Sequence, residues 1–292
     1  NIQVLGPDVN ESSFKFTVNK QKQIRFGLGA VKGVGENAVD SIIENRNKGG
    51  NYLSIYDLAK RVNLRSVNKR TLEGLAKSGA FDSFKNIHRA QYLTAGKDEL
   101  TGIDYAVKYG QQQQEAENAS QISLFGDVGS KSDSTEPRLP TCEAWSKLEQ
   151  LHHEREVIGF YLSGHPLDLF KYEMKLFCTH KCSDLQPDAL KNLYKKDFSF
   201  AGIITKANHR VGKTGKRFGI FTIEDLTSAV EFPLFDEKKY LEFEKYLKEQ
   251  MFVFVRATVQ NKYNKPEEFE LKINNIQLLG DVGEMNCRGI VV

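Results

Sequence analysis

The chain has 292 residues, which is room for about two domains at roughly 150 residues each. Its content of 40% hydrophobic and 27% charged residues excludes a wholly disordered chain, and no uncharged apolar run approaches the roughly 20 residues of a transmembrane helix. The formal net charge of +3 does not by itself indicate nucleic-acid binding, so any basic signal must be local. Four cysteines make no disulfide framework in a chain of this length, and without a signal peptide we expect a cytoplasmic protein. Because the sequence starts at Asn1 and not at Met, we expect it to be a piece of a longer protein.

The first 26 residues predict extended chain. Phe14, Phe16 and Val18 alternate with polar residues, and Ile24 and Phe26 repeat the alternation after a polar turn. Two such runs across a turn are typical of a β-hairpin.

A glycine-rich segment, residues 27–35, precedes the first clear helical pattern. A dinucleotide-binding turn would need a buried strand before these glycines and another strand after the helix, and the flanking sequences fit neither. The alternative is a helix-hairpin-helix, with a short helix over 28–32, a glycine hairpin and a second helix. Glycines let the chain turn sharply, and the N–H groups at a helix start can hold a phosphate. We favour this over a plain turn between helices and expect DNA contacts from Lys32, Gly33, Val34, Gly35 and Asn37.

A looser second copy of the hairpin follows, with a helix over Leu72–Lys77 and a turn at Ser78–Phe81. It has one glycine in the turn, so we expect it to be mainly structural. Another helical stretch covers residues 87–109.

From Gln111 the sequence becomes polar, and residues 126–140 are typical of a linker. An apolar island, Ile122–Phe125, interrupts this tract. It either packs on its own domain or forms a short linear peptide, with a glutamine and apolar anchors, that docks on a partner. Helical periodicity returns over residues 143–157 and ends at Gly164-His165-Pro166.

The last third has β texture in the order β-β-β-α-β-β, the layout of a five-stranded OB barrel. Its strands are predicted at 198–206, 218–224, 229–235, 252–260 and 269–278, with a helix over 238–248. The loop between the first two strands is basic, and such loops bind oligonucleotides in OB folds. We therefore expect single-stranded DNA contacts from Lys206, Arg210, Lys213, Lys216 and Arg217, with one or two nearby phenylalanines stacking on bases. A solvated basic hairpin is the alternative.

Two other motifs fail on their spacing, and no catalytic pattern is found. Gly212-Lys213-Thr214 resembles the end of a phosphate-binding loop, but Ala207 stands where a glycine is required and a strand follows. Cys178, His180 and Cys182 lack the second pair of ligands that zinc sites usually show, so we predict no metal site. No nucleophile has a base near it in the sequence, and we name no catalytic residue.

Several motifs, in this order, resemble the catalytic alpha subunit of bacterial DNA polymerase III, a C-family replicative polymerase. The resemblance covers nearly the whole chain, and the motifs that carry it are the segments at residues 24–35, 67–73, 78–82, 156–168 and 218–235. The resemblance implies a multi-domain α + β chain lying C-terminal to the catalytic palm. The implied parts are the end of the fingers region (1–26), a tandem all-α helix-hairpin-helix domain (27–110), a linker with a clamp-binding peptide (111–140), a helical connector (141–192), a five-stranded OB-fold β-barrel (193–280) and a truncated tail (281–292).

The resemblance also implies function. The pentapeptide lies between the hairpin and OB domains, as the clamp motif does in that family, so we expect sliding-clamp contacts from Gln121, Ile122, Ser123, Leu124 and Phe125. Further implied partners are DNA and the other polymerase III holoenzyme subunits, with no membrane. The palm aspartates have no counterpart here, so the segment should be inactive alone and need no cofactor, while Mg²⁺ is expected for the full polymerase. The alternative function is a stand-alone OB-fold protein that binds single-stranded DNA in repair.

Overall fold

The computed structural model describes residues 3–122, 135–262 and 265–286. The chain divides into two compact units, a first unit over Asn1–Gly164 and a second unit over His165–Val292. Each has its own apolar core. Among the described residues no helix combines the length and the apolar character needed to cross a bilayer.

A small sheet opens the first unit. Strand β2 (Thr17–Val18) pairs antiparallel with β3 (Ile24–Arg25), which is the predicted hairpin. Strand β1 (Val4–Leu5) pairs parallel with β3 and was not predicted, because two residues are too short for a visible alternation. Phe26, directly after β3, is buried and packs in the apolar core of the first unit, which attaches the sheet to the helices.

Helices make up most of the first unit, as predicted. They are η1 (Leu28–Ala30), α1 (Glu36–Gly49), α2 (Ile55–Arg61), α3 (Lys69–Ser78), α4 (Arg89–Leu93), α5 (Gly102–Ile122) and α6 (Lys147–Ile158). Side-chain caps define several helix starts, since the first N–H groups of a helix lack partners within it. Asn68 accepts from the N–H of Thr71 at the start of α3, and Ser146 forms a capping box with Glu149 at the start of α6.

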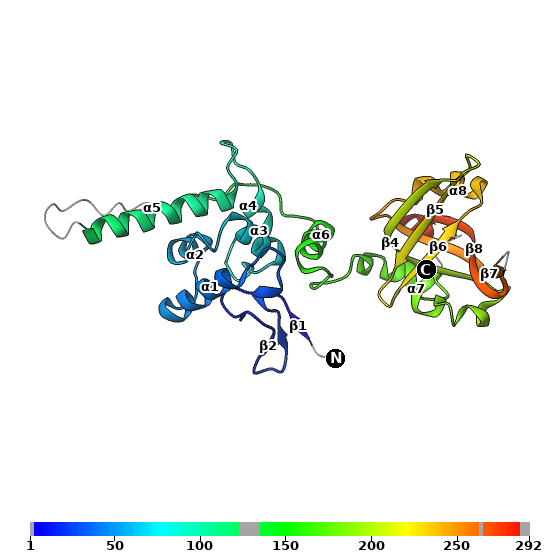
Figure 1. Ribbon diagram of the computed structural model, residues 1–292, viewed down its shortest axis with the longest axis horizontal. Helices are drawn as coiled ribbons and strands as arrows, with labels where there is room; N and C mark the ends of the chain where they lie inside the picture. The colour runs from blue at the N-terminus through cyan, green and yellow to red at the C-terminus, as the bar shows by residue number, and fades with distance from the viewer. Residues whose placement is uncertain (1–2, 123–134, 263–264, 287–292) are drawn as a thin grey trace, which may run out of the picture. The chain divides into compact units, whose positions relative to one another are not determined.

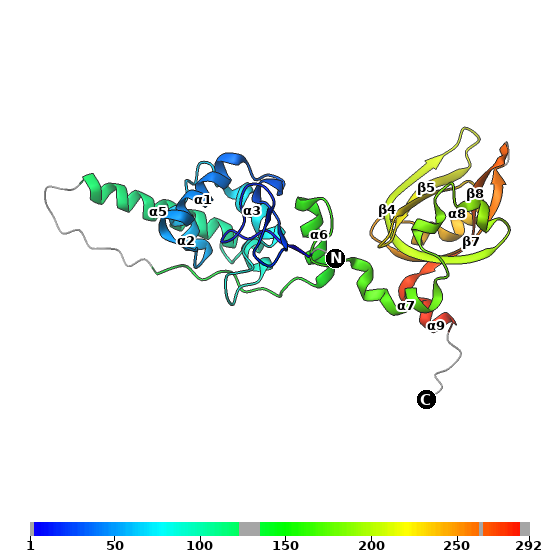
Figure 2. The same cartoon turned by 90° about the horizontal axis from the view of Figure 1, so that it is seen from below.

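The stretch over 87–109 was predicted as one helix, but the structure breaks it. A turn and an isolated bridge between Ala95 and Thr101 separate α4 from α5. Helix α5 then continues through the polar residues 111–122, where the sequence predicted a linker. It lies along α2, as Figures 1 and 2 show, and approaches so closely that a side chain on Gly110 would meet the Ala59 carbonyl at 2.5 Å.

A hydrogen-bonded contact fixes the polar half of α5. The side-chain amide of Gln114 donates to the carbonyls of Ala59, Lys60 and Val62 at 2.9–3.1 Å, which are free acceptors at the end of α2. Lys60 also pairs with Glu117 at 3.2 Å. Residues 111–122 have no apolar periodicity of their own, and tertiary contacts therefore stabilise their helical conformation.

The second unit begins with short helical segments, η2 (Pro166–Phe170), α7 (Lys171–Phe177), η3 (Cys182–Leu185) and η4 (Leu190–Leu193). One curled antiparallel sheet follows, in the order β6-β5-β4-β7-β8. Its strands are β4 (Asp197–Val211), β5 (Arg217–Glu224), β6 (Ala229–Leu234), β7 (Phe252–Lys262) and β8 (Lys265–Leu278).

Helix α8 (Glu237–Phe243), continued by η5 (Glu244–Tyr246), lies between β6 and β7 in the sequence, as predicted. Phe200, Phe221 and Phe232 fill the concave side of the sheet against Tyr240 and Phe243 of this helix. The sheet is a half-barrel whose two edges are β6 and β8. The predicted fold class, an α-helical hairpin domain followed by a five-stranded OB fold, is confirmed.

The last described helical residues are η6 (Leu279–Asp281) and α9 (Val282–Asn286). Leu279 and Val282 are buried in a small second cluster with Leu167, Ala201 and Phe254. This cluster fixes η2 and α7 to the convex side of β4 and β7.

Candidate nucleic-acid interface

The glycine hairpin of the first unit has the geometry that its sequence predicts. Gly33 has φ +88°, a backbone conformation that favours glycine, and Gly35 is the N-cap of α1. Val34 is buried between the helices, while Lys32, Gly33, Gly35 and Asn37 are exposed. The turn therefore presents its backbone to solvent and uses its one apolar side chain for packing.

Helix α3 holds this turn from the other side. The hydroxyl of Thr71 donates to the Gly33 carbonyl at 3.3 Å, and a side chain on Gly74 would meet the Lys32 carbonyl at 3.0 Å. The Lys32 N–H donates to the carbonyl of Val157 in α6 at 2.8 Å. Contacts from two helices thus fix the conformation of the turn.

Two helix N-termini meet at one hollow of about 380 Å³. Its lining includes the start of α1 and the start of α3, with Gly33, Gly35, Glu36, Asn37, Ala38, Ser66, Asn68 and Thr71. Helix N-termini carry partial positive charge, so the hollow suits an anion. The carboxylate of Glu36 at its rim is the one opposing charge in this lining.

Two exposed cations flank the hollow, and sequence reasoning found only one of them, Lys32. The other, Arg70, lies over the turn, since a side chain on Gly33 would touch its Cγ and Nε at 3.6–3.7 Å. Within the described ranges neither cation has an ion pair. Lys69, the neighbour of Arg70, is bound to Asp104 at 2.8 Å, and this hydrogen bond raises the pKa of Lys69. Arg70 is 37 positions from Gly33 in the sequence, so no local pattern placed it at this turn.

The second hairpin differs from the first at its turn. Gly79 is again left-handed, with φ +85°, but the Arg89 guanidinium and the Asp82 carboxylate crowd its Cα. Arg89 pairs with both Asp82 and the buried Glu154. The groups beside this turn are therefore bound to one another, in line with the structural role that we expect for it.

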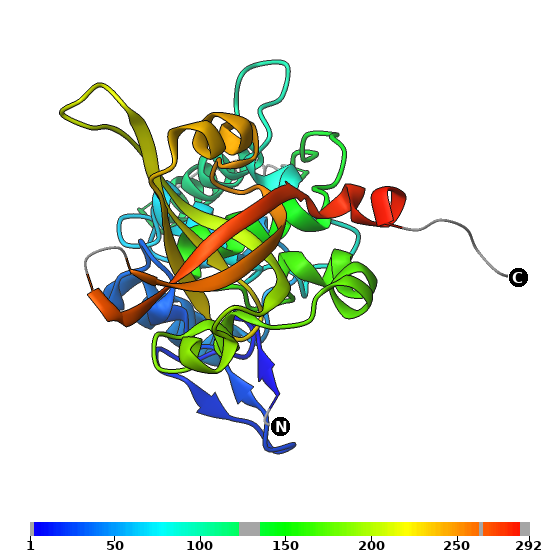
Figure 3. The same cartoon turned by 90° about the vertical axis from the view of Figure 1, so that its right-hand side faces the viewer.

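In the second unit, the cations of the predicted basic loop lie on a hairpin that we call the basic arm, residues 206–217. Strands β4 and β5 continue farther than predicted, pairing up to Val211 and Arg217, and the arm projects beyond the rest of the sheet (Figure 3). Lys206, Arg210, Lys213 and Lys216 are exposed and have no ion pair within the described part of the chain. Arg217 instead pairs with Glu244 at 2.8 Å.

The four nearby phenylalanines divide into two pairs. Phe221 and Phe232 are fully buried in the core of the second unit. Phe218 is half-buried, Phe235 is 64% exposed, and their rings lie 5.5 Å apart on the opposite face. Arg210 pairs in register with Phe218, so cations and exposed rings share one face of the sheet.

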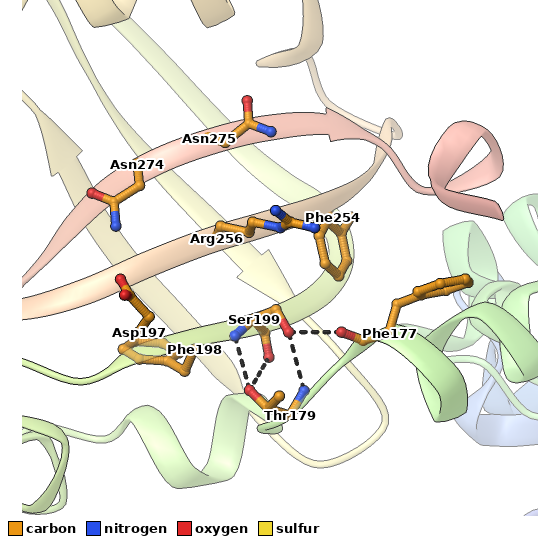
Figure 4. A pocket seen from close by; sticks show the side chains of 9 residues that line it. All are labelled: Phe177, Thr179, Asp197, Phe198, Ser199, Phe254, Arg256, Asn274 and Asn275. Carbon is orange, nitrogen blue, oxygen red and sulfur yellow. Dashed lines mark hydrogen bonds between the residues drawn. The ribbon is translucent and has the colours of Figure 1, made fainter. Parts of the chain in front are cut away.

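A separate hollow of about 510 Å³ lies over β4, β7 and β8, and its lining residues are shown in Figure 4. One cation, Arg256, and one carboxylate, Asp197, face it together with Asn274 and Asn275. Thr179 and Ser199 close one side with mutual hydrogen bonds. With balanced charges it does not resemble the basic arm, and we assign it no nucleic-acid contact.

The predicted clamp peptide is divided. Gln121 and Ile122 form the end of α5, whereas Ser123, Leu124 and Phe125 lie outside the described residues. Cys182 is buried and Cys178 half-buried, and burial raises the pKa of the Cys178 thiol to about 12. Among the described residues no group of three His, Cys, Asp or Glu side chains could hold a metal ion.

Comparison with known families defines the class of this chain. Residues 1–92 match the helix-hairpin-helix motif, and residues 198–279 match the OB-fold nucleic acid binding domain. The chain therefore joins two domain types that bind nucleic acid.

Its relatives are alpha subunits of DNA polymerase III. The chain is 34% identical to that of Escherichia coli K12 over 81% of its length, and 39% identical to that of Neisseria meningitidis serogroup A over 79%. The match to the Vibrio cholerae subunit is 29% identical and covers 100% of the chain. The chain spans 19%, 18% and 24% of these three proteins. The predicted resemblance to a C-terminal part of the alpha subunit of DNA polymerase III is confirmed.

Proposed function

We propose that this chain is the DNA-binding and sliding-clamp-binding segment of a replicative DNA polymerase III alpha subunit. The observation that carries the proposal is the first hairpin, where two helix N-termini line one hollow and two exposed cations, without an ion pair among the described residues, flank it. The relatives match both units of the chain, which favours a polymerase subunit over a stand-alone OB protein.

The hairpin of the first unit binds the backbone of duplex DNA. The N–H groups at Glu36 and Asn37 start a helix and have no carbonyl partner within it, so they are free to donate to a phosphate oxygen. Lys32 and Arg70 supply the charge that neutralises that phosphate. Such contacts hold the duplex without reading its sequence, since phosphates are the same at every base.

The basic arm of the second unit binds single-stranded DNA. Lys206, Arg210, Lys213 and Lys216 follow the phosphates, and Phe218 with Phe235 offers rings for base stacking. Stacking of this kind is worth about 1–3 kcal/mol per base and tolerates any sequence.

The segment Gln121–Phe125 binds the sliding clamp through its apolar side chains. One buried leucine or phenylalanine contributes about 1.5–3 kcal/mol, so the isolated peptide binds weakly. Tethering on DNA compensates, because it raises the effective concentration of the clamp. Contacts with other holoenzyme subunits, and Mg²⁺-dependent nucleotide transfer, belong to the full polymerase.

A salt titration tests the DNA proposal. Binding of the full chain to a single strand and to a duplex is measured from 50 to 300 mM salt, for the wild type and for Lys213→Gln combined with Lys216→Gln. We expect the double variant to lose about 1.4 units of the log–log salt slope on the single strand, at about 0.7 per phosphate contact. Its duplex binding should keep the wild-type slope. An unchanged single-strand slope would mean that the arm is a solvated hairpin.

A further inference from the structure

Both strands of the basic arm contact the segment that contains α8 and η5, and a buried tyrosine of α8, Tyr240, binds the β4 strand. The ring nitrogen Nδ1 of His209, on β4, lies 2.7 Å from the Tyr240 hydroxyl. That hydroxyl donates to Glu244 at 3.2 Å, and Tyr240 is 1% exposed. Burial and the neighbouring Glu244 carboxylate both raise the pKa of Tyr240, which keeps the hydroxyl protonated as a donor.

The β5 strand is tied to the same carboxylate. The Arg217 guanidinium donates to both oxygens of Glu244, at 2.8 and 3.3 Å. Its backbone N–H donates to Glu237 at 2.9 Å, and its guanidinium lies 5.7 Å from the centre of the Tyr240 ring. A backbone bond and a two-point ion pair therefore fix the residue where β5 begins.

Strand alternation separates these anchors from the outward-facing cations. Arg217 lies on the same face of β5 as buried Phe221, and the His209 ring contacts Phe221 at 5.4 Å. Lys206 and Arg210 lie on the opposite face of β4, with Phe218 beside Arg210. Arg217 thus faces helix α8, and the face of β5 that carries Phe218 lies on the other side of the sheet.

We propose that Tyr240 and Glu244 position the basic arm, and that Arg217 is an anchor of the arm instead of a phosphate ligand. This inference rests on the proposed single-strand binding of the arm. The four exposed cations of the arm repel one another, so a hairpin without anchors would be mobile. An arm that is held at both strands loses less conformational entropy when DNA binds. Tyr240 and Glu244 act through the arm and do not touch DNA.

The test uses the full chain, a fluorescent oligothymidine and three single changes, Tyr240→Phe, Glu244→Gln and Arg217→Gln. Tyr246→Phe is the matched control, since it removes a hydroxyl from the same helical segment. We expect each anchor change to weaken binding about three- to tenfold, the factor that lost pre-organisation supplies, at an unchanged salt slope. Amide exchange at Gly212 should quicken in the anchor variants and stay unchanged in the control.

Opposite results would overturn the inference. If Arg217 contacts phosphate, Arg217→Gln lowers the slope by about 0.7, and Glu244→Gln releases Arg217 and tightens binding. Unchanged amide exchange in Tyr240→Phe would equally show that the arm is not anchored there.

The lysine variants separate the two proposals. If Lys213→Gln with Lys216→Gln weakens binding and the anchor changes do not, the anchor role fails and the proposed function stands. If the lysine pair has no effect on single-strand binding, the proposed role of the arm fails and the anchor inference fails with it.

Discussion

The guanidinium of Arg89, at the start of α4, lies 3.4 Å from the carboxylate of Glu154 in α6. Glu154 is 1% exposed and also accepts the backbone N–H groups of Leu162 and Ser163, at 3.0 and 2.8 Å. One buried carboxylate therefore joins the second hairpin to the segment that follows α6. Helix α6 and the segment after it, up to Gly164, form part of the first unit, although the sequence analysis assigned them to a helical connector over residues 141–192.

Loss of this carboxylate should destabilise the first unit. Glu154→Ala removes the acceptor of two part-buried N–H groups and the longer of the two carboxylate contacts of Arg89, which keeps Asp82, and we expect a loss of about 2 kcal/mol. The matched control is Glu156→Ala, whose half-exposed pair with Lys77 should contribute at most about 1 kcal/mol. Urea unfolding followed by fluorescence of Trp145, the one tryptophan of the chain, reports this unit selectively. Equal losses in the two variants would contradict the burial argument.

Duplex binding should depend on Lys32 and Arg70 and not on Lys69. We expect Lys32→Glu and Arg70→Gln each to weaken duplex binding for every sequence and to lower the salt slope by about 0.9. Lys69→Gln is the control, because Lys69 is already bound to Asp104. Fluorescence anisotropy with two unrelated duplexes measures both effects. Wild-type affinity of both charge variants at low salt would rule out this hairpin as the contact.

The clamp peptide should act without supporting the fold. Leu124→Ala with Phe125→Ala should abolish capture by an immobilised bacterial sliding clamp, since each anchor contributes about 1.5–3 kcal/mol. The melting temperature should not change. Val128→Ala, another apolar change in the same tract, should alter neither measurement. A large drop in melting temperature with clamp capture intact would show that the peptide packs on its own chain.

Acid should weaken the second unit through Asp225. Burial raises the pKa of this carboxylate, but hydrogen bonds from Thr227, Cys182 and Ser228 outweigh burial and hold the pKa below the ordinary 3.8. The stabilisation is therefore complete above pH 3.8 and is lost as the pH falls through the lower folded value. Asp225→Asn should cost at least about 1.5 kcal/mol at pH 7, the value of one charge-assisted hydrogen bond. Unfolding followed by circular dichroism at pH 7 and pH 2.5 should show that cost shrinking in acid, and a constant cost would contradict the assignment.

Local patterns predicted much of the fold. Strands β5 and β6 of the second unit alternate in burial, and the predicted positions of all five strands agree with the structure within a few residues apart from the arm. The glycine hairpin was predictable because a left-handed residue next to a helix start has few alternatives to glycine. Both signals depend on residues close together in the sequence.

Other features depend on partners that are distant in the sequence. Helix α5 extends through a polar stretch because Gln114 and Gly110 contact α2, more than 50 positions away. Arg70 reaches Gly33, and Arg217 reaches Glu244, by tertiary packing that no periodicity reports. These contacts decide which cations are available to bind DNA. The sequence therefore predicted the type of site but not all of the residues that form it.

The two turns of the first unit also differ in the sign of their side-chain charge. Lys32 and Arg70 against Glu36 leave the first turn positive, whereas Asp82 and Glu154 against Arg89 leave the second turn negative. A duplex is uniformly negative, so it is attracted to one turn and repelled by the other. On the proposed duplex binding, the first turn therefore faces the DNA, and charge sets this orientation of the unit before any contact with a base.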